Sequence, residues 1–148
     1  MKIAIGCDHG GFEHKNAIAE HLKSQGFEIC DFGIYENAPA DYPDIALKVA
    51  KSVAKKENDL GILVCGTGIG MSMAANKVKG IRAAACSDHY SAKYTRLHND
   101  ANILCLGGRV IGVGTALELA DLFVGTEFEG GRHQNRINKI TDIENGGN

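Results

Sequence analysis

The sequence lacks long blocks of charge of one sign, and its formal net charge is only −2. Proteins that bind nucleic acid or an anionic membrane surface usually carry a basic patch or stripe. The first residues, MKIAIGCDHGG, contain only a short apolar run, which is typical of neither a signal peptide nor a membrane span. We therefore predict a cytoplasmic protein that has neither nucleic acid nor a membrane as its partner.

The sequence also lacks any C-x-x-C pair, and its five cysteines are an odd number. Four of them lie in or at the end of apolar runs, which favours buried thiols in a reducing compartment. Because no set of Cys, His and Asp has the spacing of a structural metal site, we predict no bound metal. The cysteines are Cys7, Cys30, Cys65, Cys86 and Cys105.

Short apolar runs alternate with longer helical patterns along the 148 residues, which suit one domain over 1–148. This alternation predicts an α/β fold, a doubly wound sheet of about five parallel strands with flanking helices and a C-terminal helical tail. The expected strands are 2–7, 27–32, 60–65, 82–87 and 102–107. The expected helices are 11–25, 43–57, 69–77, 88–98 and 112–123, with the tail at 130–144.

Polar residues gather where the predicted strands end. In an open parallel sheet, ligands bind beyond the carboxyl ends of the strands. We therefore expect the functional site among these segments, which are CDHGG at 7–11, CGTG at 65–68, SDH at 87–89 and GGR at 107–109.

The segment VCGTGIGMS, residues 64–72, places three glycines directly after a strand. Its G-x-G-x-G spacing does not match the dinucleotide fingerprint G-x-G-x-x-G, because methionine stands at position 71, where the fingerprint has its third glycine, and no acidic residue follows before Asp88. No Gly-Lys-Ser/Thr sequence closes the loop, so it is not a P-loop either. Two interpretations remain: an oxyanion-binding loop at the start of a helix, or a plain tight turn.

Cys65 ends the strand at the mouth of this loop. A helix N-terminus stabilises a thiolate, so Cys65 is a candidate nucleophile or base. The alternative is a buried structural thiol, which is the interpretation we favour for the other four cysteines. Thr67 and the glycines beside Cys65 favour a functional role for this one.

Histidines occur both at predicted strand ends and on predicted helices. Asp8 with His9, and His98 with Asn99, are candidates for acid–base work on a sugar hydroxyl or carbonyl. A lone histidine is more often a surface residue. We expect this of His14 and His21 and leave His89 and His133 open.

Three arginines are candidates for binding phosphate, because a guanidinium group can grip two phosphate oxygens at once. Arg109 follows two glycines at a strand end. Arg132 and Arg136 are four residues apart and share one face of the tail helix, where the alternative is a solvated surface.

Six motifs, taken together and in this order, resemble type B ribose-5-phosphate isomerase. That enzyme belongs to a sugar-phosphate isomerase family that also contains galactose-6-phosphate isomerase subunits. The resemblance covers almost the whole chain. The motifs are CDHGG at 7–11, DYPD at 41–44, CGTGIGMSMAANK at 65–77, RAA at 82–84, HNDANILCLGGR at 98–109 and GGRHQNR at 130–136.

The resemblance implies a Rossmann-like fold and interconversion of ribose 5-phosphate and ribulose 5-phosphate, a step of the pentose phosphate pathway in carbohydrate metabolism. It implies catalysis without metal or organic cofactor. It also implies a homodimer or a dimer of dimers, with each active site between two subunits.

The resemblance also assigns roles to residues. It implies that Cys65 is the base that moves a proton between carbons 1 and 2 through an enediolate. Some family members use a glutamate a few positions later instead, but position 69 here is isoleucine. The remaining implied roles are Thr67 as the hydroxyl beside the base; Asp8 and His98 in ring opening; Gly66, Gly68 and Gly70 in the anion hole; His9, Arg109, Arg132 and Arg136 on the phosphate; and Tyr42 and Asn99 as substrate contacts.

Two alternatives remain open from the sequence. One is an isomerase of a six-carbon sugar phosphate, such as allose 6-phosphate or galactose 6-phosphate, because one extra carbon changes only the length of the pocket. The other is a non-catalytic nucleotide-binding or flavin-binding module of flavodoxin-like architecture. The missing dinucleotide fingerprint and the absence of tryptophan argue against that module.

Overall fold

Five parallel strands form the central sheet, in the spatial order β2-β1-β3-β5-β4. They are β1 (Lys2–Cys7), β2 (Glu28–Asp31), β3 (Leu60–Cys65), β4 (Ala83–Ala85) and β5 (Ile103–Gly107). This computed structural model describes residues 1–147, so the last residue of the predicted domain 1–148 lies outside the described residues. The predicted α/β architecture with about five parallel strands is confirmed.

Every predicted helix is also present. A short 3₁₀ turn, η1 (His9–Gly11), follows β1. The α-helices are α1 (Phe12–Ser24), α2 (Tyr42–Ala54), α3 (Ile69–Ala75), α4 (His89–Asn99), α5 (Val113–Gly125) and α6 (Arg132–Glu144).

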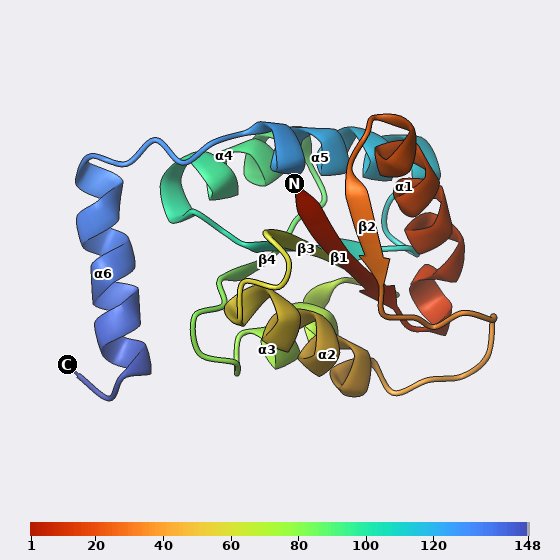
Figure 1. Ribbon diagram of the computed structural model, residues 1–148, viewed down its shortest axis with the longest axis horizontal. Coiled ribbons are helices and arrows are strands. Elements are labelled where there is room, and N and C mark those ends of the chain that lie inside the picture. The colour runs from red at the N-terminus through yellow and green to blue at the C-terminus, as the bar shows by residue number, and fades with distance from the viewer. Residues whose placement is uncertain (148) are drawn as a thin grey trace.

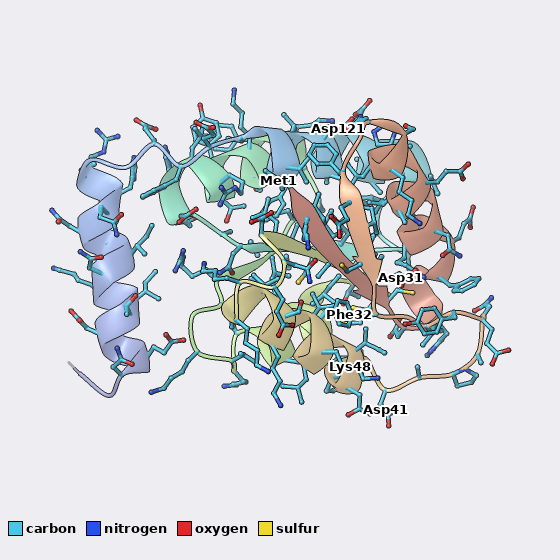
Figure 2. All side chains as sticks on the ribbon, viewed as in Figure 1. Met1, Asp31, Phe32, Asp41, Lys48 and Asp121 are labelled. Carbon is cyan, nitrogen blue, oxygen red and sulfur yellow. The ribbon has the colours of Figure 1, made fainter. Side chains whose placement is uncertain are left out.

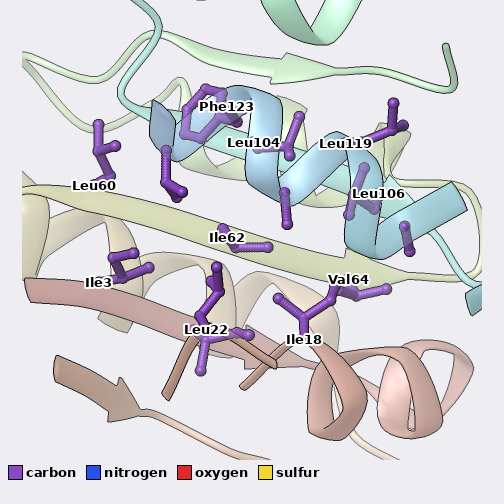
Figure 3. Packing of buried hydrophobic residues seen from close by; sticks show 14 of the residues in the cluster. Ile3, Ile18, Leu22, Leu60, Ile62, Val64, Leu104, Leu106, Leu119 and Phe123 are labelled. Carbon is purple, nitrogen blue, oxygen red and sulfur yellow. The ribbon is translucent and has the colours of Figure 1, made fainter. Parts of the chain in front are cut away.

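Helices cover both faces of the sheet, with α1, α4 and α5 on one side and α2 and α3 on the other (Figure 1). On the first side, Leu22 of α1 and Phe123 of α5 pack near Ile62 and Leu104 of the central strands (Figure 3). All four side chains are fully buried, which stabilises the fold by about 1.5–3 kcal/mol per side chain. The central strands are apolar on both faces because both faces are covered.

The strand order creates a point where neighbouring connections diverge. β1 lies between β2 and β3, and the chain leaves β1 toward α1 but leaves β3 toward α3, on the opposite face. In open parallel sheets, ligands bind beyond the carboxyl ends of strands at such a point. The topology therefore predicts that a ligand binds at residues 8–11 and 66–70, which follow β1 and β3.

The segment from Phe32 to Asp41 connects β2 to α2 along the outside of the domain (Figure 2). The start of this segment is held by Lys15 of α1, whose side chain is 1% exposed. The Lys15 ammonium donates to Asp31 Oδ2 at 2.7 Å and to the carbonyl oxygen of Ile34 at 3.0 Å. This anchor fixes the start of the segment, where the chain leaves β2.

α6 stands apart from the rest of the fold, on the side of α4 and β4, and the chain reaches it through an extended segment after α5 (Figure 1). Its far end is tied back by Glu144, whose carboxylate oxygens accept from the Gly80 N–H at 3.0 and 3.1 Å. Within residues 1–147, no helix has both the length and the apolar character needed to cross a membrane.

Candidate active site

Cys65 lies at the end of β3 with its side chain almost completely buried. The N–H of Gly68 donates to the Cys65 sulfur at 3.1 Å. Gly68 has φ of +80°, a conformation that side chains with a Cβ rarely adopt, and α3 begins at the next residue. The loop thus turns back on the sulfur and places a hydrogen-bond donor against it.

Thr67 is the exposed residue of this turn. Its hydroxyl oxygen accepts from the N–H of Ile69 at 3.2 Å. Since that contact uses the oxygen only as an acceptor, the hydroxyl hydrogen stays available to a ligand beside Cys65.

The residues that follow the neighbouring strand β5 contact the same loop. The N–H of Gly108 donates to the Cys65 carbonyl at 2.8 Å, and the N–H of Arg109 donates to the Gly66 carbonyl at 3.0 Å. The Arg109 side chain lies over Gly66: a Cβ added to Gly66 would come within 3.6 Å of Cδ and Nη1 of Arg109. The carboxyl end of β5 therefore brings a guanidinium cation next to the loop.

Asp8 and His9 reach the site from β1. Asp8 is buried, and its Oδ1 accepts from the N–H of Gly10 at 2.8 Å, which caps η1. A Cβ on Gly10 would lie 2.8 Å from the Gly66 nitrogen, so the loops after β1 and β3 are in close contact. His9 follows on the exposed side of this turn. Asp8 therefore has a structural role in addition to any chemical one.

Tyr42, the first residue of α2, covers the start of α3. A Cβ added to Gly70 would lie 2.8 Å from two carbons of the Tyr42 ring, so a larger residue here would require that ring to move. A plain tight turn explains the glycine at position 68, where φ is positive. It does not explain the glycine at position 70, which lies against the ring of Tyr42.

The structure holds His98, Asn99, Arg132 and Arg136 in a second group. His98 and Asn99 end α4, and the two arginines lie on the first two turns of α6, both exposed. Among residues 1–147, no hydrogen bond or ion pair joins this group to the loop at 66–70. The predicted site residues therefore form two groups within one chain. The His98 group contains His98, Asn99, Arg132 and Arg136, and the Cys65 group contains Cys65, Thr67, the glycines of the loop, Asp8, His9, Tyr42 and Arg109.

His98 is surrounded by other rings and a carboxylate. Its ring stacks on that of His133, with ring centres 4.1 Å apart and planes 12° apart, and meets the Tyr94 ring edge-on at 4.9 Å. Glu129 Oε2 lies 3.7 Å from His98 Nε2 and 3.9 Å from His133 Nε2. Burial, followed by the neighbouring His98 and Arg132, lowers the pKa of His133.

The sequence alone leaves the role of His133 open, but one pattern in it indicates that this residue is buried. His133 and Ile137 are four residues apart and are the buried residues of α6, one position further along than Arg132 and Arg136. An apolar residue one turn after a histidine is the pattern of a helix face that packs inward.

The surface assignment of His14 was wrong. His14 is 8% exposed, and its Nε2 lies 2.7 Å from the carbonyl oxygen of Ile111, which ties α1 to the segment before α5. His21 is half-buried and bonds to Asp121 Oδ1 at 2.8 Å.

Of the other cysteines, Cys7, Cys86 and Cys105 are buried and Cys30 is half-buried. Burial raises the pKa of Cys7 and of Cys86 to about 11. Burial also raises the pKa of Cys105 well above its ordinary value. These three therefore stay protonated near neutral pH.

Comparison with known proteins identifies one family over nearly the whole chain. The family described as Ribose/Galactose Isomerase matches residues 3–140. The curated ribose-5-phosphate isomerase B of Escherichia coli K12 is 51% identical over 143 residues, which cover 97% of this chain and 96% of that protein.

Solved structures agree over nearly the full length. Ribose-5-phosphate isomerase B of Clostridium thermocellum has a TM-score of 0.97 and 54% identity, covering 99% of both chains. The Mycoplasma genitalium structure with bound ribulose-5-phosphate has a TM-score of 0.94 and 46% identity, covering 97% of this chain and 96% of that one.

Proposed function

The chain belongs to the Ribose/Galactose Isomerase family, and we propose that it interconverts ribose 5-phosphate and ribulose 5-phosphate. One observation carries the proposal: the Cys65 sulfur is held at the carboxyl edge of the sheet by the Gly68 N–H, beside a free hydroxyl and a cation. A proton next to a carbonyl is removed by a positioned base that faces a preorganised oxyanion site.

We assign the base to Cys65. Its thiolate takes the proton from carbon 2 of the open-chain aldose, the C–H electron pair forms the carbon 1–carbon 2 double bond, and the carbonyl oxygen takes up the negative charge. Transfer of the hydroxyl proton from oxygen 2 to oxygen 1, and return of the Cys65 proton to carbon 1, gives the ketose. Thr67 supports this step, because its hydroxyl hydrogen is free to bind the developing oxyanion.

The glycine loop supplies the remaining donors. The N–H of Gly68 is already bonded to Cys65 and that of Ile69 to Thr67. We therefore assign the N–H groups of Gly66 and Gly70 to the enediolate oxygens. Removing one donor from such a site typically slows the reaction by about 10²–10³-fold.

Ring opening and phosphate binding involve both groups of residues. In this proposal Asp8 and His98 move the protons that open the furanose, while His9, Arg109, Arg132 and Arg136 bind the phosphate. Tyr42 and Asn99 contact the sugar. Since no hydrogen bond or ion pair joins the two groups within residues 1–147, we propose that each site combines the Cys65 group of one subunit with the His98 group of another.

The exposed surface supports such an assembly. Ile140 and Ile143 of α6 are exposed and line a cavity of about 690 Å³ between α6 and residues 76–84. Exposed apolar residues that line a groove are typical of a protein–protein contact. A homodimer, or a dimer of dimers, would cover them.

The experiment that tests the proposal is a comparison of substrates on the purified chain. We expect kcat/KM to be largest for ribose 5-phosphate and lower for allose 6-phosphate and galactose 6-phosphate. A larger value for either six-carbon substrate would assign the enzyme to that sugar instead. No turnover of any sugar phosphate, together with nucleotide binding in a calorimeter, would favour the non-catalytic module.

We place the reaction in cytoplasmic pentose phosphate metabolism.

A further inference from the structure

His133 of α6 has no role in the proposed mechanism. Its side chain is 5% exposed, and its Nε2 is buried without a hydrogen-bond partner in the described chain. A buried polar nitrogen without a partner lowers the stability of the fold, so hydrogen bonding does not explain the ring at this position. The contact that remains for this ring is the one its flat face makes with the ring of His98.

The ring of His133 restrains the ring of His98. With planes only 12° apart and centres 4.1 Å apart, the buried ring forms a flat wall against one face of His98. Tyr94, one turn earlier on α4, meets His98 edge-on at 77°. Contacts on a face and on an edge leave the His98 ring little freedom to rotate, although 34% of its side chain is exposed.

The backbone fixes this arrangement from the side of α6. The N–H of Glu129 donates to the Leu97 carbonyl at 3.0 Å, next to His98, and the N–H of His133 donates to the Gly130 carbonyl at 3.1 Å. The charged groups around the pair are Glu129 on this connecting segment and Arg132 and Arg136 on α6. His133 therefore connects the start of α6, which carries the arginines, to the histidine at the end of α4.

The cluster is not a preformed metal site. The ligand atoms of His98, Glu129 and His133 do lie within 4.8 Å of one another. However, a metal lies in the plane of each imidazole that binds it, and two nearly parallel, stacked rings cannot both meet that condition. The geometry fits a stack that orients one imidazole and not a cage for a cation.

We propose that His133 is a positioning residue for His98, whose ring it holds in the orientation required for opening the sugar ring. The inference rests on the proposed function, in which His98 moves a proton during ring opening. His133 contacts no substrate in this proposal and acts only through the ring stacked on it.

The test is a double-mutant cycle on ribose 5-phosphate with His98→Ala, His133→Ala and the pair. In the parent background we expect His133→Ala to lower kcat by about ten- to a hundredfold, with KM changed less than about threefold, because small misplacements of a catalytic group have effects of this size. In the His98→Ala background the same change should alter kcat by less than about twofold. An equal loss of kcat in both backgrounds, or a rise in KM alone, would overturn the proposal.

Two further variants separate positioning from folding. His133→Phe keeps a flat ring against His98 and should retain kcat within about threefold of the parent. Ile137→Ala truncates the other buried residue of α6 and should lower the melting temperature without the loss of kcat. A loss in His133→Phe equal to that in His133→Ala would contradict the stacking role. Turnover of ribose 5-phosphate by the parent protein is measured first. If the parent shows none, the proposed function is wrong; if the parent turns over but the double-mutant cycle shows no coupling, only the role of His133 is wrong.

Discussion

The two groups of site residues differ in how the fold holds them. The Cys65 group lies on strand ends whose backbones are bonded to one another, as in the contacts of Gly108 with Cys65 and of Arg109 with Gly66. The His98 group lies at the end of α4 and on α6, a helix that stands apart from the sheet (Figure 1). The group that holds the proposed base is therefore fixed by the core, whereas the His98 group, which shares in ring opening and phosphate binding, depends on the end of α4 and on an outlying helix. The two should therefore fail differently when altered.

The largest effect is expected for Cys65→Ala. Without the base, kcat for ribose 5-phosphate should fall by at least about 10³-fold, because the proton at carbon 2 has no acceptor. The circular dichroism spectrum and KM should stay close to those of the parent. Cys30→Ala is the matched control, since it removes a half-buried thiol outside both groups and should leave kcat unchanged. Substantial turnover in Cys65→Ala would remove the base from this group.

A smaller but clear effect is expected for Gly68→Ala. The new Cβ would lie 3.0–3.1 Å from backbone atoms of Cys105 and Leu106 and would require φ near +80°, so the donor to the sulfur must move. We expect kcat to fall about a hundredfold and stability to fall by about 1–2 kcal/mol.

Gly26→Ala separates these two effects. Gly26 has φ of +92° but nothing within 4 Å of its added Cβ, so it carries the same backbone strain far from the loop. Its stability should fall and its kcat should not. Equal kinetic losses in the two variants would show that the Gly68 effect is only one of folding.

On the other side of the comparison, Arg132→Ala should act mainly on KM. Phosphate contacts stabilise the bound substrate and the transition state alike, so KM should rise about ten- to a hundredfold while kcat stays within about threefold. Lys139→Ala, an exposed cation on the same helix, is the control and should change neither constant. A large loss of kcat with KM unchanged would place Arg132 in the chemical step.

The smallest effect concerns pH. Burial lowers the pKa of His133 below its ordinary value of 6.5, so an unfolded chain binds this proton before the folded one does as pH falls. Stability from neutral His133 is therefore fully present above about pH 6.5 and is lost as pH falls through the folded-state pKa. Melting temperatures between pH 7.5 and 5.0 should fall more for the parent than for His133→Phe. Parallel curves would show that this histidine titrates normally.

The sequence predicted the strands and helices well because their ends are marked by glycine and by polar residues. Asp8 after β1 and Gly26 after α1 are examples. It did not predict that β5 lies between β3 and β4, because strand order depends on packing between distant segments. It also misjudged His14, since no local pattern distinguishes a histidine bonded to a remote carbonyl from one in solvent.

In the candidate site, too, the sequence predicted local features but not contacts between distant segments. The motifs identified Cys65, Gly68 and Arg109, and the backbone of β3 and β5 brings these residues together. The sequence could not say that His98 would be stacked on His133, because the two residues come from helices joined only through α5 and a long connecting segment. Contacts of this kind follow from the tertiary arrangement and not from local periodicity.

The central claim is that one working site combines the Cys65 group and the His98 group of different subunits. Its most direct test is a mixed dimer of Cys65→Ala and His98→Ala chains, co-expressed with two different tags and isolated through both. Each variant alone should be nearly inactive. The mixed dimer has one site with both residues intact, so we expect about half of the parent kcat. A mixed dimer no more active than the two variants separately would contradict the shared site.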